Sequence, residues 1–196
     1  MLVLTSNGLS SDPLLNEMRR YLNSGRAALV VTADPVYKEK NYHVDRLTDE
    51  LRSFGLRVDC FDFDRQSPSE LLAFDVVELM GGNPYYLLHS IRKNHFMSTL
   101  EIFAQSRCVI GCSAGSMVLS PTIELIDCYS PEMNTVGIED LAACHFTNVQ
   151  VLPHYSRFLP RYRDFEEKCR QYERSNHCRV IRLDDGDGVI IRKSRE

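Results

Sequence analysis

The sequence lacks the features that mark several large classes of protein. No apolar run approaches the roughly 18–20 residues that span a bilayer, so we expect no membrane partner. The formal charge of −4 leaves no basic excess for nucleic acid, and we expect none to bind. The opening stretch MLVLTSNGLS has neither a basic region nor a signal cleavage site. These absences predict a cytoplasmic protein.

The cysteines also lack the patterns that would make them structural. There are seven, an odd number, and no two form a C-x-x-C pair. This scatter argues against a disulfide framework and favours reduced thiols that act as small hydrophobic residues. Zinc-type ligand spacing is missing as well, so we predict no metal and no cofactor.

What the chain does contain is a regular alternation of strand and helix patterns. Its 196 residues, 43% of them hydrophobic, suit one domain, which we place over 1–196. Strands are predicted at 2–5, 27–32, 57–62, 76–80, 108–112, 149–152, 179–183 and 189–191. Helices are predicted at 12–18 with Asp12 as cap, 42–54, 68–74, 85–93, 96–105 and 158–173. This order indicates an α/β fold whose mostly parallel sheet carries helices on both faces, with ligands at the carboxyl ends of the strands.

A serine turn follows the predicted strand 108–112. Its residues, Gly111 to Gly115, read GCSAG and fit the pattern G-x-S-x-G. The pattern places a serine on a strained strand-to-helix turn, where its hydroxyl is exposed and the helix amides favour negative charge. We therefore predict Ser113 as a nucleophile. Cys112 is the alternative, as in a cysteine hydrolase, although the two glycines straddle Ser113.

A serine nucleophile needs a base, and a base needs an orienting acid. Among six histidines, His154 is the one that follows a predicted strand at its carboxyl end, so we predict it as the base. The acid stays open. Asp184 and Asp185 follow another strand, whereas Glu124 and Asp127 lie after the serine helix. We favour Asp185, with Asp127 as the alternative.

Two backbone amides are candidates for an oxyanion hole. One belongs to Ala114, the residue after the nucleophile, and the other to Gly82, at the end of the predicted strand 76–80. Asn83 follows as a helix cap or a substrate contact. A glycine-rich turn with no catalytic role explains Gly82 about equally well.

Taken in order, these motifs resemble the peptidase E family of serine peptidases, which includes aspartyl dipeptidases and cyanophycinase-like enzymes. The resemblance rests on Ser6-Asn7, Gly81-Gly82-Asn83, Gly111-Cys112-Ser113-Ala114-Gly115, Pro121-Thr122, Pro153-His154-Tyr155 and Leu183-Asp184-Asp185-Gly186. It implies a flavodoxin-like fold similar to class I glutamine amidotransferases, with serine replacing cysteine at the elbow. It also implies that Ser113 is the nucleophile and His154 the base, while the acid corresponds to Asp185 or to a position beside Asp127.

The resemblance further implies a peptidase that acts on short peptides through an acyl-enzyme, with Asp-X dipeptides as candidate substrates. Aspartyl dipeptidases of this family hold the substrate with an arginine downstream of the histidine. Arg157, Arg161, Arg163 and Lys168 are available here, and Arg161 is our candidate. We expect a monomer or a homodimer.

Two other interpretations stay open. An α/β-hydrolase-type esterase would share the serine elbow. A non-catalytic binding protein could keep the fold without the reaction. A separation beyond about 5 Å between the Ser113 hydroxyl and the His154 ring would favour the binding protein.

Overall fold

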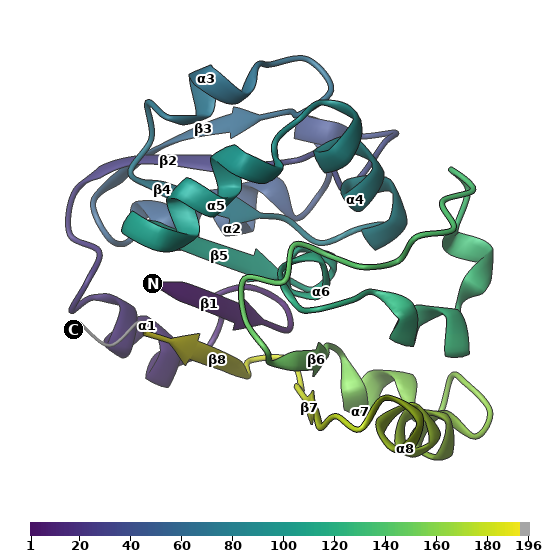
Figure 1. The fold of residues 1–196 in the computed structure, drawn as a ribbon. Coiled ribbons are helices and arrows are strands. Elements are labelled where there is room, and N and C mark those ends of the chain that lie inside the picture. The colour runs from purple at the N-terminus through teal and green to yellow at the C-terminus, as the bar shows by residue number, and fades with distance from the viewer. Residues whose placement is uncertain (193–196) are drawn as a thin grey trace.

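A six-stranded sheet forms the centre of the computed structural model, which describes residues 1–192 (Figure 1). The strands lie in the order β3-β2-β4-β5-β1-β8. They are β1 (Leu2–Thr5), β2 (Gly25–Val30), β3 (Leu56–Phe61), β4 (Val76–Leu79), β5 (Cys108–Cys112) and β8 (Gly188–Ile191). Neighbouring strands are parallel except β1 and β8, which are antiparallel. The predicted α/β class with a mostly parallel sheet is confirmed.

Helices cover both faces of this sheet. On one face, α1 (Asp12–Met18) and α2 (Val44–Arg52) bury an apolar cluster against the strands. The other face carries α3 (Pro68–Leu71), α4 (Pro84–Lys93), α5 (Met97–Ser106) and α6 (Ala114–Leu119). Because both faces are buried, the central strands are apolar on both sides, which explains their unbroken hydrophobic runs. No helix in residues 1–192 is long and apolar enough to cross a membrane.

A second sheet of two parallel strands lies beyond the carboxyl ends of β1 and β5 (Figure 1). Its strands are β6 (Gln150–Leu152) and β7 (Val180–Arg182), and the chain between them forms α7 (Tyr155–Phe158) and α8 (Phe165–Asn176). Three short 3₁₀ segments complete the described elements: η1 (Lys38–Lys40), η2 (Glu124–Cys128) and η3 (Pro131–Met133). The second sheet thus lies next to the strand ends where we expect a ligand to bind.

The helix predicted over 158–173 begins too early: its second part corresponds to α8, whereas Phe158 ends α7 and residues 159–164 lie between the two helices. Pro160 has no N–H for a helical hydrogen bond, and Asp164 takes a left-handed conformation with φ of 53°. The break turns the chain so that Phe165 meets Tyr129 edge-on, with ring centroids 5.0 Å apart. A tertiary aromatic contact of this kind lies outside any local sequence pattern.

The other predicted boundaries differ from the structure by a few residues. Ser11 occupies the N-cap of α1, whereas Asp12, the predicted cap, lies in the first turn. The strand predicted at 27–32 begins earlier, at Gly25. The helix predicted at 42–54 is shorter at both ends, as α2. Fraying of element ends accounts for differences of this size.

Candidate active site

Ser113 stands on a sharp turn between β5 and α6. Its backbone has φ of 50° and ψ of −110°, a conformation that costs a non-glycine residue energy and that clusters at functional sites. The turn is possible because small residues let α6 approach the sheet closely. A Cβ on Gly115 would overlap the carbonyl oxygen of Leu79 in β4. A Cβ on Gly111 would lie 2.6 Å from the amide nitrogen of Ser116.

Hydrogen bonds to β1 fix the same turn. The amide of Ser113 donates to the Thr5 carbonyl at 3.0 Å. The buried Ser116 hydroxyl accepts from the Thr5 amide at 2.8 Å and lies 2.7 Å from the Gly111 carbonyl. Ser113 is thus held by the end of β1 as well as by its own strand.

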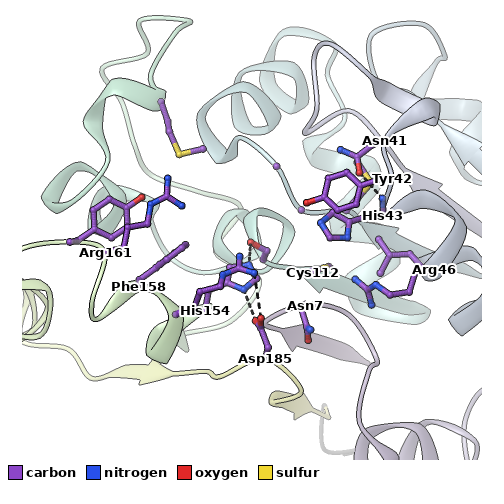
Figure 2. Close-up of a pocket in the computed structure, with 18 residues that line it drawn as sticks. Asn7, Asn41, Tyr42, His43, Arg46, Cys112, His154, Phe158, Arg161 and Asp185 are labelled. Carbon is purple, nitrogen blue, oxygen red and sulfur yellow. Dashed lines mark hydrogen bonds and ion pairs between the residues drawn. The ribbon is translucent and has the colours of Figure 1, made fainter.

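His154 reaches the turn from the second sheet. It follows β6 and adopts a left-handed conformation, with φ of 58°, that turns its ring toward Ser113. The His154 Nε2 lies 2.9 Å from the Ser113 Oγ, and its Nδ1 lies 2.5 Å from the Asp185 Oδ1 (Figure 2). The Ser6 hydroxyl, at the end of β1, accepts from the His154 amide at 2.8 Å and donates to Asp185 at 2.9 Å.

The electrostatics of this group favour a neutral imidazole beside an ionised carboxylate. Burial lowers the pKa of His154 below its ordinary value and nearby Arg157 adds to the effect, whereas the hydrogen bond with Asp185 opposes it. Burial would raise the pKa of Asp185, but its hydrogen bonds with His154 and Ser6 outweigh burial and hold that pKa low. An ionised Asp185 holds the proton on Nδ1, which leaves Nε2 to accept the proton of the serine hydroxyl.

The two candidate acids occupy different places. Asp185 meets the imidazole, whereas the structure does not bring Asp127 to it. The Asp127 carboxylate accepts a hydrogen bond from the Tyr85 hydroxyl instead. Asp184, next to Asp185, accepts from the Ser156 amide at 2.7 Å and so caps α7.

The glycine turn after β4 lies against Ser113. A Cβ on Gly81 would sit 3.1 Å from the Cβ of Ser113, and Gly82 has φ of 149° and passes close to the Ala33 carbonyl. Neither the Gly82 amide nor the Ala114 amide donates to a backbone carbonyl in residues 1–192. Both amides therefore remain the candidates for an oxyanion hole.

Asn83 is fully engaged in structure. Its side-chain oxygen accepts from the Tyr85 and Tyr86 amides at 3.0 and 3.1 Å, which caps α4. Its side-chain nitrogen donates to the Met133 carbonyl at 2.7 Å. The residue does not line the cavity in front of Ser113, so the structure does not bring it to a substrate.

Cys112 points into the apolar cluster beneath α1 and α2, and it is 4% exposed. Burial raises the pKa of its thiol. Because the thiolate is the reactive form of cysteine, this environment keeps Cys112 unreactive. The geometry favours Ser113 as the nucleophile.

A cavity of about 430 Å³ opens in front of Ser113, a size within the range of small-molecule sites. Its lining consists of Asn7, Asn41, Tyr42, His43, Arg46, Leu47, Met80, Gly81, Gly82, Cys112, Ser113, Met133, His154, Arg157, Phe158, Arg161, Tyr162 and Asp185. Three arginines and one carboxylate make the lining positive. Arg157 lies 3.5 Å from Asp185, and Arg46 pairs with Glu50. Arg161 forms no ion pair within residues 1–192, and its guanidinium lies over the Tyr162 ring at 5.4 Å.

Sequence reasoning missed several members of this site. Ser6 contacts both His154 and Asp185; it belongs to the motifs that carry the resemblance, but sequence reasoning gave it no role. Tyr42, His43 and Arg46 line the cavity from a loop and helix that looked ordinary in the sequence. The carboxyl end of β1, next to β5, was the available signal for Ser6.

Comparison with known proteins places this site in a family. The sequence model of peptidase family S51 matches residues 2–195. The chain belongs to peptidase family S51. An uncharacterised peptidase of Listeria monocytogenes is 28% identical over 160 residues, which are 79% of this chain and 78% of that protein. An uncharacterised peptidase of Listeria innocua is 25% identical over 94% of this chain and 93% of its own length.

Solved structures share the S51 fold. A candidate peptidase E protein from Listeria monocytogenes superposes with a TM-score of 0.81 at 23% identity, covering 99% of this chain and 95% of that one. A peptidase from an acI-B1 actinobacterium gives a TM-score of 0.66 at 16% identity, covering 94% and 80% of the two chains. The expected resemblance to peptidase E is confirmed, and the S51 protein is a serine-type peptidase. Family membership sets aside the esterase and the non-catalytic binding protein.

Proposed function

We propose that this S51 peptidase hydrolyses short peptides through an acyl-enzyme on Ser113, with His154 as general base and Asp185 as its orienting acid. The observation that carries the proposal is the continuous contact from Ser113 Oγ to His154 Nε2 at 2.9 Å and from His154 Nδ1 to Asp185 at 2.5 Å. All three residues line the cavity, which is large enough for a short peptide.

The reaction follows from these positions. His154 Nε2 takes the hydroxyl proton while Ser113 Oγ bonds to the scissile carbonyl carbon. The carbonyl oxygen becomes negative and faces the Gly82 and Ala114 amides. His154 then gives its proton to the leaving amine as the C–N bond breaks. A water molecule, activated by the same imidazole, releases the acyl group and restores the hydroxyl.

For substrate selection, we propose that Arg161 pairs with a carboxylate on the acyl residue, as an Asp-X dipeptide would supply. Arg161 lines the cavity and forms no ion pair in residues 1–192, so its donors are available to a substrate. The Tyr162 ring beneath it holds the guanidinium in place.

A fluorophosphonate probe combined with a dipeptide library tests the proposal. The probe should label wild-type protein at Ser113 and leave Ser113→Ala unlabelled. The library should show hydrolysis by wild type and by Cys112→Ala, and none by Ser113→Ala. A folded wild-type protein that takes up no probe and cleaves no dipeptide would overturn the proposal. Equal rates on Asp-Leu and Ala-Leu would remove the role of Arg161.

A further inference from the structure

The cavity has a second cationic end, on the far side of the catalytic residues from Arg161. Figure 2 shows Arg161 on one side of His154 and Arg46 on the other. A peptide extends in opposite directions from its scissile carbonyl. If the Arg161 end takes the acyl residue, the Arg46 end must take the residue that leaves.

We propose that Arg46 binds the free C-terminal carboxylate of the leaving residue. The enzyme would then select dipeptides because it recognises the negative charge on the second residue of the substrate. This inference rests on the proposed function, in which Ser113 is acylated and Arg161 faces the acyl residue. It adds a binding site for a terminal carboxylate and disfavours peptides whose chain continues or is amidated at that point.

An ion pair outside the cavity lining positions Arg46 for this contact. One of its terminal nitrogens pairs with Glu50, which is four residues along α2 and does not line the cavity. Glu50 is anchored in turn, because it accepts the Leu9 amide at 2.9 Å. A guanidinium has five N–H donors, and in residues 1–192 the only partner of the Arg46 guanidinium is Glu50. Glu50 thus orients the fork and leaves its remaining donors for a carboxylate.

The wall beside Arg46 is held by hydrogen bonds of its own. We call residues 34–43 the rim loop. The Asp34 carboxylate accepts the Val36 and Tyr37 amides, each at 3.0 Å, and the Asn41 side-chain amide at 2.6 Å. Asn41 in turn accepts the His43 amide at 2.8 Å. A preformed wall reduces the ordering cost of binding.

A buried ion pair fastens the middle of the rim loop to the sheet. Lys38 is 8% exposed, and its ammonium lies 3.0 Å from Asp62 and 2.5 Å from Asp64. The Tyr86 ring lies beneath the ammonium at 5.4 Å. At the end of the same loop, Tyr42 is 82% exposed beside the cavity, where it offers an aromatic face to the leaving side chain.

The local charge suits an anion. The cavity lining has Arg46, Arg157 and Arg161 against a single carboxylate, and that carboxylate already faces His154. Burial lowers the pKa of His43, and the positive charges of Arg46 and Arg157 lower it further. The lining therefore carries a net positive charge, which Glu50 behind Arg46 offsets in part, and a substrate carboxylate would be stabilised there.

Two pairs of substrates test the inference: Asp-Leu with Asp-Leu amide, and Ala-Leu with Ala-Leu amide. Wild type should cleave each free dipeptide faster than its amide, by about 10- to 100-fold in kcat/KM, the range expected for a charged hydrogen bond. Arg46→Gln should lose that preference, mainly through a higher KM for the free dipeptide, with the amide little changed. Arg46→Lys should keep part of it.

Arg52→Gln is the matched control, because Arg52 lies on the same helix and does not line the cavity. It should keep the wild-type preference. If Arg46→Gln alone unfolds, the double variant Arg46→Gln with Glu50→Gln removes both charges and should show the same loss. Labelling of Ser113 by the fluorophosphonate should persist in every Arg46 variant.

The outcomes separate this inference from the proposed function. Labelling at Ser113 with equal cleavage of free and amidated dipeptides would overturn the role of Arg46 and leave the acyl-enzyme intact. An equal loss on both substrates in Arg46→Gln would also overturn it, because a structural defect affects both. Absence of labelling and of all hydrolysis in folded wild type would overturn the proposed function and this inference with it.

Discussion

The two halves of the candidate active site are held by different forces. Ser113 stands at the end of a buried strand, and its position depends on how closely α6 approaches β4 through Gly115. His154 and Asp185 stand at the rim, where hydrogen bonds among themselves and with Ser6 hold them. We call Ser113 and the packing around it the sheet half, and His154 with Asp185 and Ser6 the rim half. The sheet half has no room for added atoms, whereas the rim half cannot lose polar ones.

Exposure follows this division only at Asp185 and Arg157, because Ser6 is fully buried and the His154 side chain is 11% exposed. Val109 and Ile110, in the strand that carries the nucleophile, are fully buried. The Asp185 side chain is 37% exposed and that of Arg157 is 62% exposed. A change in the sheet half should therefore affect stability and activity together. A change at the exposed Asp185 or Arg157 should affect the reaction and leave the fold intact.

The largest effect is expected from Gly115→Ala. The new methyl group would overlap the Leu79 carbonyl, so α6 must move away from β4 and carry Ser113 with it. We expect a loss of about 3 kcal/mol or more in the free energy of unfolding, at the upper end of overpacking effects. Urea unfolding and peptide hydrolysis, measured together, should both show the loss.

Gly188→Ala is the control for this substitution. Its Cβ would meet the ends of the Leu14 side chain at 3.1 Å and the Leu4 carbonyl at 3.1 Å, so small movements can relieve the contact. We expect a cost below about 1 kcal/mol. A Gly115→Ala variant as stable as Gly188→Ala would show that close packing of α6 against β4 does not position the sheet half.

In the rim half, Asp185→Asn should reduce kcat by about 10²- to 10⁴-fold with little change in KM. An asparagine amide can donate to Nδ1 and so favour the wrong tautomer of His154. Steady-state kinetics, with circular dichroism and urea unfolding as checks, would show an intact fold.

Asp184→Asn makes the same chemical change one residue earlier. Its side-chain oxygen can still accept the Ser156 amide, so activity should stay within a few-fold of wild type. If Asp185→Asn kept activity and Asp127→Asn lost it, the acid would belong to the loop after α6.

The same contrast explains which parts of the site could be predicted from sequence. The two glycines that flank Ser113 form a local pattern, which sufficed to single it out, although Thr5 and Leu79 also hold its turn. His154 and Asp185 were marked by their places after predicted strands. The choice between Asp185 and Asp127 needed the tertiary contact with the imidazole, which no spacing supplies.

The rim loop shows where sequence reasoning fails. Its position beside the cavity depends on the ion pairs of Lys38 with Asp62 and Asp64, which lie 24 and 26 residues away in the chain. The fold class was predictable because strand and helix patterns are local. The division of the strands into two sheets was not, because it depends on the separate pairing of β6 with β7.

A buried acid in the sheet half gives the third prediction. Glu78 on β4 is fully buried, and neither of its carboxylate oxygens has a hydrogen-bond partner in residues 1–192. Burial raises the pKa of Glu78 from 4.5 to about 8. The unfolded chain therefore ionises first as the pH rises, and stability falls between about pH 4.5 and pH 8.

Glu78→Met should remove that loss. Relative to wild type, it should gain about 3 kcal/mol more stability near pH 7.5 than near pH 5, measured by urea unfolding. Glu78→Gln also removes the ionisation, so it should show the same pH dependence with a smaller gain, because it keeps a buried polar group. Activity should have the same pH profile in both variants as in wild type, because the titration of Glu78 changes the stability of the fold and not the reaction.

The smallest effect is expected in the rim half, from Arg157→Gln. The positive charge of Arg157 disfavours the imidazolium and so helps burial to lower the pKa of His154. Without that charge the pKa rises, and the acid limb of kcat/KM must move to higher pH because His154 acts as a base only when neutral. The shift should be small and salt-sensitive, since water and ions screen an exposed guanidinium. Arg163→Gln, at an arginine outside the cavity lining, should leave the limb in place. A limb that moved to lower pH in Arg157→Gln would show that a group other than His154 controls activity.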